Sequence, residues 1–301
     1  MNRRELMTGA LALGAAGLPM QSFARVSLGS GTLTTVSDGN LVLPAGFLFD
    51  TMPQDELPAL RERFGLTGDQ LTPECNLALY QDGERTVLFD VGSGPDFMPS
   101  AGILTDSLDA LGLAPEDITH VLFTHAHPDH IWGLLDDFGD PLFTEASYMM
   151  GRAEWDYWYD PNTVDTIRED RAAFAVGARR RMELIEDAVE FFDDGDEVLP
   201  GIAAIATYGH TPGHMSFEIR QGDDAALVVG DAIGNHHLAF ARPDWASGAD
   251  QDTDAAITAR LRLLDRLASE QMRMVGFHLP DGGMGRVERA DGAYRFVSDA
   301  S

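Results

Sequence analysis

Short apolar runs separated by turn-forming residues recur along the chain, and this pattern predicts a protein rich in β-strands. One run of apolar and β-branched residues opens at Ile118 and predicts a buried strand. The other predicted strands are residues 32–37, 76–80, 86–90, 202–207, 216–220, 225–230 and 272–277. Residues 38–40 and 81–84 each contain Asp-Gly and predict turns. Two segments, residues 107–113 and 254–270, predict helices.

Residues 143–195 depart from the strand pattern and predict an insertion or a helical layer. Within this segment, residues 163–192 are expected to be largely helical, and residues 154–160 are dense in aromatic side chains. These aromatic side chains either form part of a substrate pocket or pack the helix onto the rest of the protein. The same two alternatives apply to Phe47 and Phe49, which lie in a segment flanked by Pro and Gly.

The strand that opens at residue 118 ends in four metal-capable side chains within six positions: His125, His127, Asp129 and His130. Residues two apart in an extended chain project to the same side, so His125 and His127 can hold one ion together. Pro128 suits the first turn of a helix, which carries Asp129 and His130 towards a second position. Imidazole and carboxylate ligands at this density are typical of a zinc-type site.

The spacing His125-x-His127-x-Asp129-His130 resembles the signature of the metallo-β-lactamase-fold hydrolases. Further matching segments are residues 37–39, 199–201, 209–214, 230–231 and 292–297. The resemblance spans residue 32 to the C-terminus and is closest to the exported branch that includes methyl parathion hydrolase and lactonase-like proteins. It implies an α/β fold of the αββα sandwich type, in which two mixed β-sheets are flanked by helices.

The resemblance also implies seven ligands for two divalent metal ions. They are His125, His127 and His210 on one ion, Asp129, His130 and His278 on the other, and Asp231 as the bridge. Zn²⁺ is the expected ion, and Mn²⁺, Co²⁺ or Fe²⁺ suit the same ligands. Such a pair of ions lowers the pKa of a shared water, which can then attack a carbonyl or phosphoryl centre. Asp129 and Asp231 are the catalytic carboxylates in this scheme.

Two residues are expected to support these ligands from outside. Asp90 ends a predicted strand before a Gly-rich loop and matches the aspartate that lies behind the ligand loop in this fold. Carboxylates in that position orient ligating imidazoles, although a plain turn cap is the other interpretation of Asp90. His214 matches a histidine that lies near the ions without binding them.

The expected ligand set indicates the type of reaction but leaves several substrate classes open. Asp instead of Cys at position 231 favours relatives of lactonases, thioesterases and phosphotriesterases over the main subclass of zinc β-lactamases. We therefore expect hydrolysis of lactones, carboxylic esters or phosphotriesters. The alternative is a mononuclear iron oxidoreductase of the same fold, similar to persulfide dioxygenases, and the number of bound ions separates the two.

Four residues are candidates for the substrate pocket: Trp132, His236, His237 and Phe240. Trp132 stands where similar proteins carry a smaller side chain, and the two histidines either contact substrate or lie free in a loop. The chain contains no Lys, and Arg242 is the single basic residue in the loop after the bridging aspartate. A pocket with few cations suits a neutral, apolar small-molecule substrate.

The chain carries a formal net charge of −28, and all 21 of its basic residues are Arg. An acidic surface repels phosphate backbones and anionic membranes, so neither nucleic acid nor stable membrane association is expected. The 301 residues contain no linker or internal repeat and predict one domain, residues 25–301. The oligomeric state stays open, and a homodimer is compatible with the sequence.

Residues 1–24 predict a twin-arginine signal peptide. Arg3 and Arg4 precede a short apolar run at residues 7–20, and small residues near Ala24 allow cleavage. We expect the twin-arginine machinery to export the folded chain to the periplasm. The single Cys75 can form no internal disulfide and is expected in the core.

Overall fold

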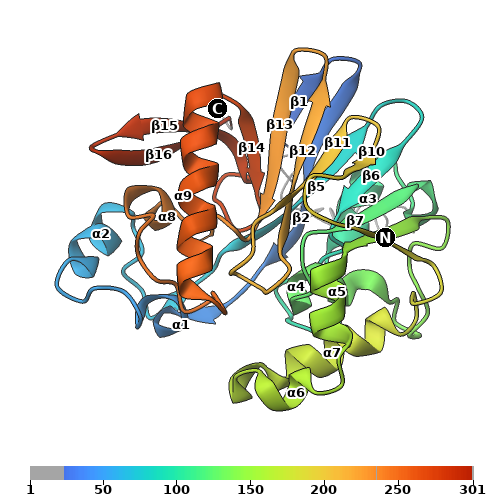
Figure 1. The fold of residues 1–301 in the computed structure, drawn as a ribbon, viewed down its shortest axis with the longest axis horizontal. Helices are drawn as coiled ribbons and strands as arrows, with labels where there is room; N and C mark the ends of the chain where they lie inside the picture. Colours follow the sequence, from blue (N-terminus) through green and yellow to red (C-terminus); the bar gives the residue numbers. More distant parts are fainter. Residues whose placement is uncertain (1–23, 235, 300–301) are drawn as a thin grey trace, which may run out of the picture.

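The computed structural model of the chain describes residues 24–234 and 236–299. Two seven-stranded sheets pack face to face, and helices cover their outer faces (Figure 1). The predicted αββα sandwich with two mixed sheets is confirmed, since both sheets contain parallel and antiparallel pairs. The predicted signal peptide lies outside the described residues, apart from its last residue, Ala24.

The first sheet has the strand order β1-β2-β5-β6-β7-β8-β9 and the second runs from β10 to β16 in sequence order. The strands of the first sheet are β1 (Arg25–Leu28), β2 (Gly31–Asn40), β5 (Glu74–Gln81), β6 (Thr86–Phe89), β7 (His120–Phe123), β8 (Ser147–Gly151) and β9 (Val189–Phe192). Those of the second are β10 (Glu197–Leu199), β11 (Ile202–Ala206), β12 (Met215–Gln221), β13 (Asp224–Gly230), β14 (Arg273–Gly276), β15 (Met284–Ala290) and β16 (Ala293–Ser298). A two-stranded sheet pairs β3 (Leu43–Pro44) with β4 (Gln70–Leu71).

The helices fall into three groups by the surface that they cover. The first sheet packs against α3 (Leu104–Ala110), α4 (Pro128–Ile131), α5 (Arg152–Tyr159), α6 (Thr163–Thr166) and α7 (Ala172–Met182). The second sheet packs against α8 (Leu238–Ala241) and α9 (Thr253–Glu270), and a separate cluster contains α1 (Ala45–Phe49) and α2 (Leu57–Arg63). Short 3₁₀ helices occur at η1 (Pro115–Asp117), η2 (Trp132–Leu134) and η3 (Glu169–Arg171).

The side chains of a central strand alternate between two cores, as its pleat requires. In β13, Ala226 and Val228 face the first sheet, whereas Leu227 and Val229 face α9. A strand buried on both faces appears in the sequence as a continuous apolar run, which is why it was predicted reliably. The core between the sheets therefore fixes where each strand ends, and several strand ends carry the candidate ligands.

The predicted helical layer at residues 143–195 is only partly correct. Helices α5, α6 and α7 lie there, but β8 and β9 extend the first sheet as parallel strands. These strands are only five and four residues long, so their apolar runs are too short for periodicity to separate a strand from a helix. The predicted turn at residues 38–40 is also wrong, because β2 continues to Asn40 through an irregular register.

Helix α9 is the clearest match between sequence and structure. It begins after Asp252, whose side chain accepts a hydrogen bond from the Ala255 N–H at 3.1 Å. It ends at Gln271 in the left-handed conformation, and its apolar face packs on the second sheet (Figure 1). Among the described residues no helix combines the length and apolar character needed to cross a membrane.

Candidate metal centre

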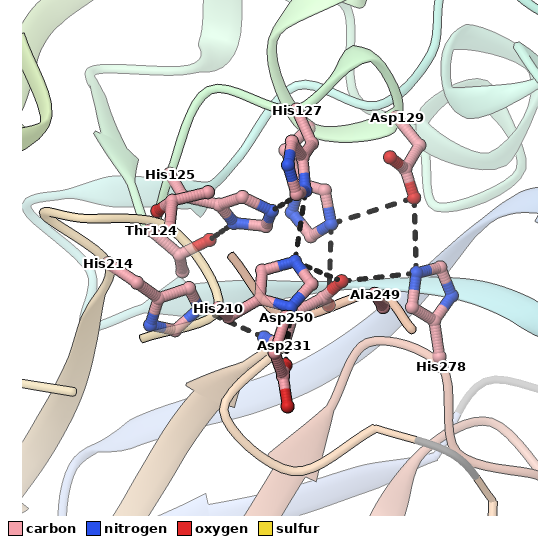
Figure 2. A network of polar contacts seen from close by, with 12 residues as sticks. Thr124, His125, His127, Asp129, His210, His214, Asp231, Ala249, Asp250 and His278 are labelled. Carbon is pink, nitrogen blue, oxygen red and sulfur yellow. Dashed lines mark hydrogen bonds and ion pairs between the residues drawn. The ribbon is translucent and has the colours of Figure 1, made fainter. Parts of the chain in front are cut away.

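Three imidazole rings meet where the ends of β7 and β11 approach each other. The His127 Nδ1 atom lies 3.0 Å from the His125 Nε2 atom and 2.9 Å from the His210 Nε2 atom. Figure 2 shows these three side chains pointing towards one another, and all three are buried. The turn after β7 places His125 and His127 on the same side, as their two-residue spacing predicts.

A second group of donors lies beside the first. The His278 Nε2 atom is 3.1 Å from the Asp129 Oδ2 atom and 3.3 Å from the Asp231 Oδ2 atom. The His130 Nε2 atom is 3.4 Å from the Asp231 Oδ1 atom. Asp231 also reaches the first group, since its Oδ2 atom lies 3.3 Å from the His210 Nε2 atom (Figure 2). The Asp231 carboxylate therefore lies between the two groups.

These donors fit two divalent cations better than they fit one another. The Asp129 Oδ2, His130 Nε2 and Asp231 Oδ1 atoms are buried, and none has a hydrogen-bond partner among the described residues. Buried polar atoms without partners are destabilising unless an ion or another ligand satisfies them. Donor atoms of all seven predicted ligands gather here. His125, His127, His210 and Asp231 form one group, whereas Asp129 and His278 gather with Cys75, and His130 gathers with Asp231 and His278.

The two groups differ in electrostatics. Burial and the neighbouring imidazoles hold the pKa values of His125 and His127 well below the ordinary value, so these rings are neutral. Burial alone would lower the pKa of His130, but the Asp231, Asp129 and Asp90 carboxylates raise it to about 10. His125 and His127 thus offer neutral imidazoles, which is the form that binds metals. In the second group, burial would likewise lower the pKa of His278, but the Asp231 and Asp129 carboxylates raise it well above the ordinary value.

The sequence pattern of the metallo-beta-lactamase superfamily matches residues 73–278 of the chain. The chain belongs to this superfamily. The crystal structure of AbOPH, a hydrolase of the beta-lactamase superfamily, has a TM-score of 0.86 and 25% identity, covering 93% of this chain and 98% of that one. The structure of AidC, a dizinc quorum-quenching lactonase in complex with the product N-hexanoyl-L-homoserine, has a TM-score of 0.85 with the same identity and coverage. An uncharacterised protein of Mycobacterium tuberculosis is 29% identical over 210 residues, which is 67% of this chain and 85% of its own length.

Both outer residues that the sequence suggested lie next to the donors of this metallo-β-lactamase fold. The Asp90 Oδ2 atom lies 2.8 Å from the His130 Nδ1 atom and accepts a hydrogen bond from the Thr124 hydroxyl at 2.7 Å. His214 accepts a hydrogen bond from the Asp231 backbone N–H at 3.0 Å, while its Nδ1 atom pairs with the Thr207 hydroxyl. Both ring nitrogens of His214 are therefore hydrogen-bonded. His214 holds the backbone of Asp231 in place and does not itself point at the donor atoms.

Sequence reasoning missed Glu154, which joins two ligand loops. This buried carboxylate accepts hydrogen bonds from the Ala126 N–H at 2.9 Å, the Thr211 hydroxyl at 2.7 Å and the Gly213 N–H at 2.9 Å. The Trp158 indole N–H donates to it at 2.6 Å. An acidic residue four positions before a Trp in an aromatic-rich segment was the available signal, but the partners of Glu154 lie too far away in sequence to be inferred.

The donors form the floor of a cavity of about 210 Å³. Its walls are mostly apolar, and their side chains include Leu41, Leu43, Phe47, Phe49, Leu66, Leu71, Phe97 and Phe174. Phe47 and Phe49 therefore line the cavity, which was one of the two alternatives that the sequence left open. His236 also lines it, whereas the predictions for three other residues need correction.

Trp132, His237 and Phe240 lie away from the cavity. Trp132 is behind Phe97, with ring centroids 5.5 Å apart, and the Arg181 guanidinium covers its ring at 4.5 Å. Phe240 is 1% exposed and packs in the core beneath α9. His237 contacts the Phe64 ring in a separate surface groove. All three residues lie in or next to short helices, which point their side chains at neighbouring residues and not into the cavity. The sequence around them was interpreted as loop, so these orientations were not predicted.

The expectation of few cations at the pocket is also wrong, because Arg171 and Arg260 line the cavity. Both side chains are 2% exposed. Arg171 donates to the Gly248 and Ala249 carbonyl oxygens at 2.7 and 2.8 Å, while its Nε and Nη1 atoms have no hydrogen-bond partner among the described residues. The two guanidinium groups are far from the ligand motifs in sequence, so composition alone suggested that the pocket lacked them.

Proposed function

We propose that the chain is a dinuclear metal-dependent hydrolase that acts on neutral lactones or carboxylic esters. The observation that carries the proposal is the position of Asp231 between two groups of buried donors on the floor of an apolar cavity. Two adjoining groups that share a carboxylate suit a pair of ions. His125, His127 and His210 would hold one ion, Asp129, His130 and His278 the other, and Asp231 would bridge them, with Zn²⁺ as the expected metal.

A pair of divalent ions supplies Lewis acidity and lowers the pKa of water. The chain's own side chains do the rest of the work. Asp90 and the Glu74 carbonyl oxygen fix the outer nitrogens of His130 and His278 at 2.8 Å each. Aromatic walls, including Phe47, exclude water from the reacting carbonyl. The Asp129 carboxylate, whose Oδ2 atom lies 3.1 Å from the His278 Nε2 atom, would take a proton from the attacking water and return it to the leaving oxygen.

The apolar walls favour substrates with an apolar body and little charge. A neutral lactone or aryl ester develops negative charge only in the transition state, where two cations stabilise it most. The likeness to AidC, a lactonase, supports the same class. Phosphotriesters rank second as substrates, and phosphomonoesters and oligonucleotides rank last, because the cavity walls are mostly apolar and the Arg260 guanidinium binds loop carbonyl oxygens.

Two measurements test the proposal. Elemental analysis of gently purified protein should find about two metal ions per chain, and a maximum of one ion under metal excess would favour the mononuclear oxidoreductase alternative. Side-by-side kinetics on one metal-loaded preparation should then give the highest kcat/KM for lactones or aryl esters. A phosphomonoester as the best substrate would refute the substrate class while leaving the two-ion site intact.

We further propose that the twin-arginine signal at residues 1–24 exports the folded protein to the periplasm. The support is the Arg3-Arg4 pair followed by a short apolar run. Replacing both arginines by lysine should leave the precursor in the cytoplasm, as measured by cell fractionation. Unchanged export of that double variant would refute the twin-arginine assignment.

A further inference from the structure

His210 has a partner on the side of its ring that faces away from the other donors. Its Nε2 atom points at the first donor group, whereas its Nδ1 atom lies 3.3 Å from the Asp250 Oδ1 atom. The Asp250 side chain is only 4% exposed. A buried carboxylate on the outer nitrogen of a ligating imidazole fixes the tautomer and the ring orientation.

Asp250 is itself held by a buried cation. The Arg260 Nη1 atom lies 3.5 Å from the Asp250 Oδ2 atom, and the Arg260 side chain is 2% exposed. Arg260 projects from α9 and donates to the Pro243 and Trp245 carbonyl oxygens at 2.9 and 2.8 Å. The guanidinium is therefore immobilised, and it neutralises a carboxylate that would otherwise be costly to bury.

The backbone on both sides of Asp250 is fastened as well. The Gln251 and Asp252 N–H groups donate to the Gly209 carbonyl oxygen at 3.0 and 2.8 Å, which docks this loop on the loop of His210. On the other side, Arg171 binds the two carbonyl oxygens that precede Asp250. Two buried arginines from different helical segments thus fix one loop, and the loop presents its carboxylate to a candidate ligand.

We propose that Asp250 is a positioning residue that sets the tautomer and orientation of His210, and that Arg260 keeps Asp250 in place. The proposal rests on the proposed two-ion site, because it gives the first ion an orienting carboxylate comparable to Asp90 beside the second. With the proton of His210 held on Nδ1 by Asp250, the Nε2 lone pair faces the donor group before any ion arrives. Nothing in this step requires Asp250 to touch substrate.

The deciding variant is Asp250→Asn, which keeps the size of the side chain and removes its charge. Chelator competition with Zn²⁺ should show binding of one of the two ions weakened by about tenfold to a hundredfold, the range for losing such an outer carboxylate. The other ion should keep its original affinity. The imidazole ¹⁵N shifts of His210 in the metal-free protein should show loss of the single Nδ1-protonated tautomer.

Asp244→Asn is the matched control, because Asp244 lies in the same region but is 59% exposed and pairs with Arg242. It should change neither metal affinity nor the His210 shifts. If Asp250→Asn lowers the melting temperature of the metal-free protein but leaves both ions and the His210 tautomer unchanged, Asp250 is purely structural and the proposal is overturned. These readouts need no substrate, so failure of the proposed hydrolysis would leave this result interpretable.

Discussion

The two sheets deliver their candidate ligands in different ways. The first sheet supplies four of them from one turn after β7, where His125 to His130 occupy six consecutive positions. The second sheet supplies three from separate loops after β11, β13 and β14: His210, Asp231 and His278. A single turn keeps its ligands together through local geometry. The three loops need long-range contacts to bring theirs to the same place.

Those long-range contacts include hydrogen bonds to two carboxylates. Glu154 on α5 binds the loop of His210 and also the turn after β7. The Glu74 carboxylate accepts the Asp281 and Gly282 N–H groups and so fastens the loop after His278. The difference teaches that local geometry places the contiguous ligands, whereas hydrogen bonds to carboxylates fasten loops that carry the dispersed ligands.

The largest effect is expected from breaking the connection between the two halves at Glu154. Glu154→Ala leaves four buried donors unpaired, on Ala126, Trp158, Thr211 and Gly213. We expect a loss of about 3–5 kcal/mol in the free energy of unfolding, because an unpaired buried donor costs about 1–3 kcal/mol and partial relaxation reduces the total. Chemical denaturation of the metal-free protein measures this loss.

Asp156→Ala on the same helix is the control, since Asp156 is exposed and should change stability by less than about 0.5 kcal/mol. Metal content should also fall in Glu154→Ala, because both ligand loops lose their common partner. A Glu154→Ala protein as stable as the control would show that the two halves are joined by the sheet core alone.

How much of this arrangement the sequence could predict follows from the same difference. The four ligands after β7 are adjacent in the chain, so their spacing alone predicted a metal site. His210, Asp231 and His278 were found through the resemblance to a family, and in the structure their donor atoms lie beside those of the turn after β7. The central strands were predictable because they are continuous apolar runs, whereas their arrangement as a sandwich was expected from the resemblance. The short strands β8 and β9 were not, since four or five residues carry too little pattern.

Asp90 and Asp250 show where prediction stops. Each lies 40 positions from the histidine that it contacts. Asp90 had a local signal, because it ends a strand before a Gly-rich loop, whereas Asp250 sits in an acidic loop where nothing distinguishes it from its neighbours. Glu154, Arg171 and Arg260 were missed for the same reason. Their roles depend on tertiary contacts that no local pattern encodes.

A smaller effect is expected when the support of the contiguous turn is removed. Asp90→Asn keeps the side-chain size but places an amide N–H₂ group opposite the His130 ring and the Thr124 hydroxyl. We expect metal affinity to fall by about tenfold to a hundredfold at the second ion, with the first ion retained. Chelator competition measures both affinities.

Asp106→Asn on α3 is the control for Asp90→Asn, because Asp106 is exposed. The informative comparison is with Asp250→Asn, because each variant should lower the binding affinity of a different ion. If both variants lose the same ion, Asp90 and Asp250 do not orient ligands of different ions.

The smallest effect is expected from a glycine in the loop that Arg171 fastens. A Cβ atom at Gly248 would lie 1.9 Å from the Phe47 carbonyl oxygen, so Gly248→Ala should push α1 and its cavity-lining Phe47 outward at a cost of about 1–3 kcal/mol. Gly234→Ala is the control, because Gly234 also lines the cavity and a Cβ there meets nothing closer than 3.9 Å. We expect Gly248→Ala to raise KM for apolar esters and to retain both ions, since Arg260 holds Asp250 independently. Loss of an ion in Gly248→Ala, but not in Gly234→Ala, would show that the loop moves as one body. The contacts of Arg171 and Arg260 with the loop would then not be independent.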